Sequence, residues 1–467
     1  MACLFFVLIL PGIRGEGRIA SASEGPVSAP VPTPPPQLVA PGSGAVEGGD
    51  RSRQTGAAFP VPLRLSVPPL SARVSGDVVA ATIAKLIASG TASSKAELVR
   101  ASGLARTTVD AALSGLRAAD VIRSGGLRSP EGRGRPAETL ELDPAFGVVL
   151  VADCGAIAAR LGVLDLGQRL LASTELDLRI DAGPDVVLAR IVASFQAMLA
   201  DLDMADVPRV AVMGVPGPVD ALHGTVVRPP IMPGWDGVEV ARHLGAALGC
   251  PARLENDVNL RALGEMRALD RIDGPLLYVK VGTGIGGGLV TPDGNLLHGA
   301  DGAAGDIGHV RVAGSTVVCV CGNVGCLEAV ASLATITREL DPDAEWGVEA
   351  HQRVLARIAA REPEAVQVVR ERAAAVGEVV ASLVHFVNPT RVVVGGSLAA
   401  VSDDLLAGIR SVVYQRALPL ATRNLTLSPP VLGRDSGLAG GLVIGIERTL
   451  DADTLGARIA EAVRRAR

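Results

Sequence analysis

The strongest constraint on the fold lies between residues 305 and 328, where one histidine and three cysteines fall within eighteen residues. His309 follows a Gly-Asp-Ile-Gly turn, and Cys319, Cys321 and Cys326 form the pattern Cys-x-Cys-Gly-x-x-Gly-Cys. The glycines let the loop bend back so that the sulfurs converge, and three thiolates with one imidazole complete a tetrahedral zinc shell. Since no coordination position stays open, the sequence predicts a structural zinc and not a catalytic one.

A polar segment follows the short strand predicted at 252–254 and reads Glu255-Asn256-Asp257-Val258-Asn259. The carboxylate of Asp257 can take a proton from a sugar hydroxyl as a general base, and Asn256 can hydrogen-bond the neighbouring hydroxyls. The alternative is structural, because an Asn-Asp pair at this position can also cap the helix that follows.

Apolar runs alternate with helical segments between residues 144 and 450. Buried strands are predicted at 148–152, 210–215, 276–281 and 391–394, with a long helix at 185–201. Strands that alternate with helices and end in glycine-rich turns predict an α/β domain with a cleft along those turns. Glycine-rich turns alone indicate phosphate binding weakly, since tight hairpins use them too. Cys154 and Cys250 lie in apolar surroundings and are predicted to be core residues.

Three short helices are predicted upstream, at 77–89, at 95–101 and from 105 onward. A short helix, a glycine-containing turn and a longer helix form the arrangement that places the last helix in a DNA major groove. Arg106, Thr107, Asp110 and Ala111 are predicted to face outward near its start. Arg106 can contact a guanine edge or a phosphate, and Thr107 and Thr108 can hydrogen-bond phosphates. Asp110 is unfavourable there because its carboxylate repels DNA. The alternative is a helical hairpin used for dimerisation.

An arginine-rich hairpin is predicted after the third helix. Gly132-Arg133-Gly134-Arg135 precedes an alternating strand at 139–142. Two arginines spaced by glycine can enter a narrow minor groove, which predicts the wing of a winged helix-turn-helix. A flexible solvated loop is the alternative. Charge supports the DNA interpretation, since residues 71–140 carry ten basic against six acidic side chains although the chain has a net charge of -5.

Four segments are predicted in all: a disordered Pro/Gly/Ala-rich leader at 1–70, a DNA-binding domain at 71–143, the α/β domain at 144–450 and a helical tail at 451–467. The apolar run at 4–10 has no basic residue before it and is too short to span a membrane, so a secretion or anchor signal is the less favoured interpretation. We therefore predict a cytoplasmic protein.

Taken together, these residues resemble the ROK family of repressors, open reading frames and sugar kinases, over roughly residues 75–450. The resemblance implies an α/β fold, with an N-terminal winged helix-turn-helix followed by a two-lobed, actin-like (ribonuclease H-like) sugar-kinase domain. It implies that His309 and the three cysteines hold the zinc, and that Asp257 would deprotonate the sugar 6-hydroxyl. The implied sugar-binding residues are Asn256, Asp257, Asp306, His309 and Glu328. The implied ATP-binding residues are Asp153, Gly155, Gly282, Gly284, Gly286, Gly395 and Gly396.

Two positions depart from the family's kinase pattern. The first phosphate loop of the kinases reads Asp-x-Gly-Gly-Thr, whereas this chain has Ala156 and Ile157 in place of the last two residues. Ile157 lacks a hydroxyl for phosphate, and Ala156 adds a methyl where the backbone must approach closely. Asp306 stands where the family usually has Glu, which shortens a sugar-binding arm. The pattern favours a kept sugar pocket beside a damaged ATP site.

We therefore predict a sugar-responsive DNA-binding transcription regulator, a repressor of carbohydrate metabolism genes, and not an enzyme. Its expected partners are operator DNA, a monosaccharide effector and further copies of itself in a dimer or tetramer. The alternative is an active ROK hexokinase that uses ATP and magnesium with Asp257 as base. A third interpretation is that the winged helix only mediates assembly.

Overall fold

A mixed sheet forms one half of the α/β domain. The computed structural model describes residues 51–54, 57–67, 74–128, 137–205, 207–271 and 273–465. The strands of this sheet are β1 (Arg51–Gln54), β2 (Ala57–Ala58), β5 (Val148–Cys154), β6 (Ala158–Asp165), β7 (Arg169–Asp177), β8 (Pro208–Val215) and β11 (Ala252–Asn256). They run in the order β1-β7-β6-β5-β8-β11, and β2 also pairs with β7. The strands from β5 to β7 are antiparallel neighbours, whereas β8 and β11 continue parallel to β5.

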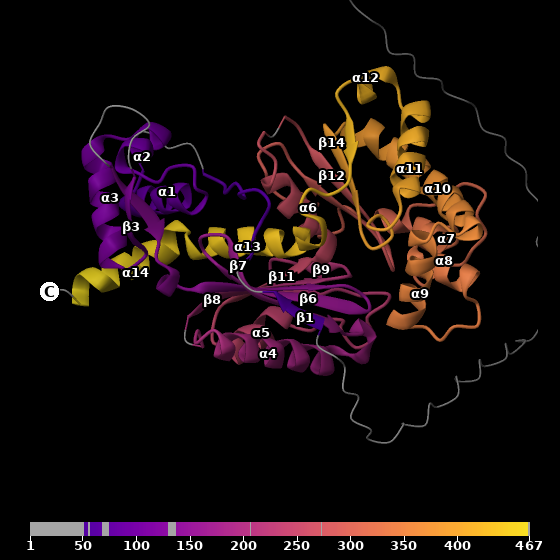
Figure 1. The fold of residues 1–467 in the computed structure, drawn as a ribbon, viewed down its shortest axis with the longest axis horizontal. Coiled ribbons are helices and arrows are strands. Elements are labelled where there is room, and N and C mark those ends of the chain that lie inside the picture. The colour runs from indigo at the N-terminus through magenta and orange to yellow at the C-terminus, as the bar shows by residue number, and fades with distance from the viewer. Residues whose placement is uncertain are drawn as a thin grey trace, which may run out of the picture. The chain divides into compact units, whose positions relative to one another are not determined.

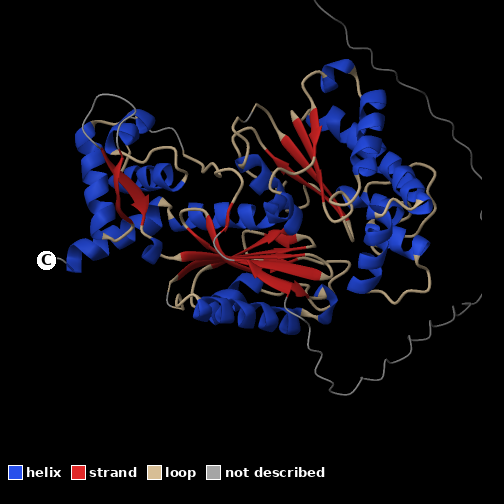
Figure 2. Cartoon of the chain, viewed as in Figure 1, coloured by secondary structure: helices blue, strands red, loops and turns tan. Residues whose placement is uncertain are grey.

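Helices cover both faces of this sheet (Figure 2). On one face lie α4 (Pro184–Asp201) and α5 (Val240–Leu248), and on the other lie α6 (Asp257–Arg267) and α13 (Ser436–Thr449) (Figure 1). Every residue of β5 is buried, which explains why its sequence is a continuous apolar run and not an alternating one.

The second sheet has the same pattern as β6-β5-β8-β11 of the first sheet, an antiparallel pair followed by parallel strands. Its strands are β12 (Leu276–Val281), β13 (Ile285–Val290), β14 (Arg391–Gly395) and β15 (Thr426–Ser428). They run β13-β12-β14-β15, with an antiparallel hairpin first and parallel strands after it. The helices that follow the hairpin are α7 (Leu327–Ala331), α8 (Leu333–Leu340), α9 (Val348–Ala359), α10 (Pro363–Val387), α11 (Asp403–Arg416) and α12 (Pro419–Thr422). The predicted α/β architecture is confirmed for this part of the chain.

Three helices and a hairpin precede the α/β domain. They are α1 (Gly76–Ala88), α2 (Lys95–Ser102), α3 (Arg106–Ala118), β3 (Ile122–Arg128) and β4 (Ala137–Leu142). Ser94 and Glu97 form a reciprocal capping box at the start of α2, and Gly103, with φ of 67°, ends it. The predicted hairpin tip, with Arg133 and Arg135, lies outside the described residues.

The described part of the predicted leader corrects the boundary that we placed at residue 70. β1 and β2 extend the first sheet, and Leu63 is fully buried. The Gln168 side chain holds this segment, since its Oε1 accepts from the Leu63 N–H at 2.7 Å and its Nε2 donates to the Leu63 carbonyl at 2.9 Å. Val61, Leu63, Leu65 and Val67 alternate with other residues, a pattern that the high proline and glycine content obscured.

The predicted C-terminal tail is helix α14 (Ala452–Arg465). It packs on α1 and α3 and not on the second sheet (Figure 1). Leu455 is fully buried, and a methyl at Gly115 of α3 would lie 3.2 Å from Ile459. The last helix of the chain therefore belongs to the core of the N-terminal module. Within the described ranges, no helix is both long and apolar enough to cross a membrane.

Candidate functional site

A cavity of about 830 Å³ lies where the strands of the two sheets end. The structure brings every residue implied as sugar- or ATP-binding to its lining: Asp153, Gly155, Asn256, Asp257, Gly282, Gly284, Gly286, Asp306, His309, Glu328, Gly395 and Gly396. These residues lie up to 243 positions apart, from Asp153 to Gly396, so the fold and not the local sequence gathers them.

Asn256 has a structural role at the junction of β11 and α6. Its Oδ1 accepts from the N–H groups of Val258 and Asn259 at 2.9 and 3.2 Å, and its Nδ2 donates to the Gly217 carbonyl at 3.1 Å. The helix-cap interpretation is therefore correct for Asn256. Asp257 begins α6 directly after this cap, and its side chain lines the cavity.

His298, which the sequence analysis did not identify, contacts Glu255 next to the site. Its Nε2 lies 2.7 Å from Oε2 of Glu255, whose other oxygen accepts from the Asn259 amide at 2.9 Å. This contact with Glu255 raises the pKa of His298. The pair connects the loop after β13 to the end of β11, directly before α6.

Two buried carboxylates of the cleft each have a basic partner that the sequence analysis also missed. Asp153 forms an ion pair with Arg261 at 2.6 Å, and Asp257 forms one with Lys280. Burial raises the pKa of the Asp153 carboxyl, and Arg261 opposes that shift. A methyl at Gly437 would lie 2.0 Å from Asp153, so only glycine lets α13 approach this carboxylate.

Glu328 packs against the glycine-rich turn between β12 and β13. Its Oε2 accepts from the Ile285 N–H at 3.0 Å. A Cβ at Gly284 would lie 2.5 Å from the same oxygen. The turn that the resemblance assigns to ATP therefore also positions a residue that it assigns to the sugar.

Gly284→Ala is therefore expected to displace Glu328 and to weaken monosaccharide binding about tenfold, since overpacking costs about 1–3 kcal/mol. Isothermal titration calorimetry with a sugar panel measures the change. Gly347→Ala is the matched control, because a methyl there meets nothing within 4 Å. Equal affinities for both variants would contradict this role of the turn.

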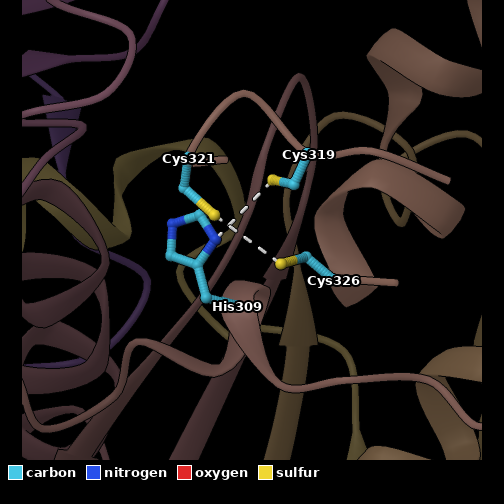
Figure 3. A group of neighbouring side chains, drawn as sticks. All are labelled: His309, Cys319, Cys321 and Cys326. Atoms are coloured by element: carbon cyan, nitrogen blue, oxygen red, sulfur yellow. Dashed lines mark hydrogen bonds between the residues drawn. The ribbon is translucent and has the colours of Figure 1, made fainter. Parts of the chain in front are cut away.

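His309, Cys319, Cys321 and Cys326 converge on one point (Figure 3). Their ligand atoms all lie within 4.8 Å of one another. The Cys321 and Cys326 sulfurs are 3.7 Å apart, and His309 Nδ1 lies 3.8 Å from the Cys319 sulfur. A tetrahedron with metal–sulfur bonds of about 2.3 Å has sulfur–sulfur edges of about 3.8 Å. The group can therefore hold a metal ion, and its geometry is compatible with zinc.

The three thiols differ in how readily they ionise. Burial raises the pKa of Cys319 and raises that of Cys326 to about 12, whereas the backbone N–H of Asn323 lowers that of Cys321. Buried thiolates at Cys319 and Cys326 therefore require a nearby positive charge. His309 would use Nδ1 toward the metal, and its Nε2 lies 3.8 Å from Asp306 at the cavity.

Ala156 and Ile157 also line the cavity, as the phosphate-loop comparison requires. Opposite them, Gly396 has a φ of 101°, and a methyl on it would lie 2.4 Å from the Val281 carbonyl. His351, also missed, is 1% exposed, and its Nδ1 lies 2.7 Å from the Gly347 carbonyl. The glycines that the resemblance assigns to ATP and the apolar side chain of Ile157 thus line the same cavity.

Three of the five side chains predicted to contact DNA lie in the described part of the N-terminal module. Arg106 and Thr107 are exposed at the first turn of α3, and Thr108 is half-buried. Asp110, whose charge opposes DNA binding, forms an ion pair with Lys95 of α2. This pair neutralises the unfavourable carboxylate.

The chain was compared with known proteins. The glucokinase of Thermotoga maritima is 31% identical over 320 residues, which are 63% of this chain and 96% of that protein. The transcriptional repressor Mlc of Escherichia coli is 24% identical over 364 residues, 75% of this chain and 88% of Mlc. The solved structure of a ROK family transcriptional regulator, a homolog of Mlc, matches with a TM-score of 0.67 and 24% sequence identity. The match covers 83% of this chain and 99% of the regulator's chain. The family model for ROK matches residues 150–447, so the chain belongs to the ROK family, as predicted.

Proposed function

We infer that the chain is a sugar-responsive transcription regulator, acting as a repressor on operator DNA. The observation that carries this proposal is the extent of the similarity. The glucokinase aligns with 63% of the chain, whereas the fold of the regulator covers 83% of it. The three-helix module lies outside residues 150–447, the part that the ROK family model matches.

The N-terminal module, residues 71–143, would act as a winged helix-turn-helix. α3 would enter the major groove, with Arg106, Thr107 and Thr108 at its leading turn. Arg133 and Arg135 would reach the minor groove from the hairpin tip. A dimer or tetramer would present two such modules to a palindromic site.

The cleft of the domain at 144–450 would bind a monosaccharide. Asp257, Asp306, His309 and Glu328 would contact its hydroxyls, and Asn256 would hold the segment. Zinc on His309 and the three cysteines would be structural, since it would fix the loop between His309 and Glu328.

Contacts between the module and the α/β domain support a route for the signal. Gln168 lies in the turn between β6 and β7, and its Nε2 donates to the carbonyl of Ala88 at the end of α1, at 3.1 Å. α13 contacts Asp153 through Gly437 and continues into α14, which packs on α1 and α3. Closure of the cleft on a sugar would shift both connections, provided that the sugar binds the two conformations with different affinity.

A gel shift with the DNA upstream of the chain's own gene tests the proposal, with and without a panel of monosaccharides. We expect salt-dependent binding to that DNA and a change of at least tenfold in affinity with one sugar. The proposal fails if no sugar changes DNA binding or if the zinc-loaded protein ignores every fragment.

An active ATP-dependent hexokinase is the second candidate, favoured by the identity to glucokinase and by the place of Asp257 in the cleft. Against it stands Ile157 in the phosphate loop. A coupled ADP-release assay with hexoses separates the two, since turnover above about 1 s⁻¹ is ordinary for kinases. Ile157→Thr is expected to raise ATP affinity by a few fold in a nucleotide-binding titration, and an unchanged affinity would contradict the role given to Ile157.

A further inference from the structure

The ion pair between Lys280 and Asp257 is the feature of the cleft that the proposed function does not explain. Asp257 lies on α6 and Lys280 on β12, and their side chains are 2% and 14% exposed. Nζ of Lys280 donates to Oδ2 of Asp257. The Asp257 carboxylate, which would accept a proton from a sugar hydroxyl, thus already accepts a hydrogen bond from the Lys280 ammonium group.

Lysine is a rare residue in this chain, in which nearly all basic side chains are arginines. The chain contains 41 arginines and only three lysines, of which Lys280 is the single one in the α/β domain. A lysine ammonium is a compact charge with three donors, whereas a guanidinium is a wide planar fork. Lys280 lies beside Gly282, where an added Cβ would lie 3.7 Å from Cε of Lys280, an ordinary van der Waals distance.

Lys280 also affects a second carboxylate. Burial and the charge of Asp257 raise the pKa of Asp153, whereas the charges of Arg261 and Lys280 lower it. The side chains of Asp153, Asp257, Arg261 and Lys280 therefore form one electrostatically coupled group. Two carboxylates are balanced by two basic side chains from the chain itself. Pairs of carboxylates in clefts otherwise suit hard divalent cations such as Mg²⁺ or Mn²⁺.

We propose that Lys280 is a positioning residue, whose ammonium holds Asp257 as a hydrogen-bond acceptor for a neutral sugar and occupies the place of a divalent cation. This inference deepens the proposed function and rests on it for the identity of the ligand. The cleft then binds a sugar without a divalent metal and is set for binding instead of phosphoryl transfer.

The test that needs no sugar uses Mn²⁺, whose free six-line paramagnetic resonance signal is lost on binding. Lys280→Met is expected to bind one Mn²⁺ per chain at least tenfold more tightly than the wild-type protein. Lys95→Met, which removes a lysine from an ion pair with Asp110 in the N-terminal module, should behave as wild type. Asp257→Asn combined with Lys280→Met should lose the new Mn²⁺ site. Unchanged Mn²⁺ binding in folded Lys280→Met overturns the inference.

A double-mutant cycle in sugar affinity gives the second measurement, with D-glucose and D-xylose as probes. Lys280→Met should weaken binding at least tenfold in the wild-type background and less than twofold in the Asp257→Asn background, because Lys280 acts through Asp257. Additive losses would overturn the positioning role. If Lys280→Met does not fold, Lys280→Gln, which also removes the positive charge, replaces it in both measurements. Absence of any sugar binding by the wild type contradicts the proposed function alone, since the Mn²⁺ result still decides the role of Lys280.

Discussion

Cys326→Ser is expected to release the metal and to weaken sugar binding together. Its sulfur lies 3.7 Å from that of Cys321, and a serine oxygen is a poor ligand in this soft set. Structural zinc contributes about 10–16 kcal/mol of binding free energy in small zinc domains. If even about 5 kcal/mol of this stabilises the native loop, the melting temperature falls by about 10 °C or more. Sugar affinity should fall about 10- to 100-fold, because His309 loses the metal that orients it.

The measurements are zinc content by mass spectrometry, a thermal melt and calorimetric sugar titration. Cys250→Ala is the matched control, since Cys250 is buried in the first sheet's core and outside the His/Cys group. It should keep one zinc per chain and unchanged sugar affinity. A Cys326→Ser protein that retains a full complement of zinc would contradict the assigned ligand set. A zinc-free protein with normal sugar response would contradict the link between metal and cleft.

Replacing Arg133 and Arg135 together by alanine should weaken DNA binding about 10- to 100-fold at physiological salt. Two fewer contacts with the DNA should also reduce the slope of log affinity against log salt by about 2. The loss should be nearly equal for operator and unrelated DNA, because these side chains would sense charge and groove width. Arg106→Ala should instead lower the preference for the operator, by about 1–3 kcal/mol.

Fluorescence anisotropy over a range of salt concentrations measures both effects. Arg271→Ala with Arg353→Ala is the matched control, since it removes two exposed arginines from the α/β domain. An unchanged salt slope in the Arg133/Arg135 variant would contradict the wing assignment. If Arg106→Ala lowers the affinity for operator and unrelated DNA equally, Arg106 contacts a phosphate and not a base edge.

The helices and strands could be predicted closely where the pattern is local. The helices predicted at 77–89 and 95–101 are α1 and α2, and the strand predicted at 276–281 is β12. The convergence of the three cysteines with His309 followed from their spacing and the glycines between them. The family followed from the same short motifs. Such features depend on residues that lie close together in the sequence, so the local sequence is enough to predict them.

Other features depended on how distant segments meet. Lys280 and Asp257 are 23 positions apart on different elements, and Gln168 and Ala88 are 80 apart. The order of strands and the position of α6 decide these contacts, and periodicity along one segment carries no information about them. The same holds for α14, which reads as a separate tail but packs in the N-terminal core.

The sequence by itself therefore determined the elements, the metal-binding group and the family, because each depends on short-range spacing. Only the tertiary structure decided which basic side chain faces each cleft carboxylate, that Asn256 caps α6, and that residues 57–67 and α14 connect the two domains. The physical reason is that burial of charges and amides requires partners, and the folded chain supplies them from positions that the local pattern does not constrain.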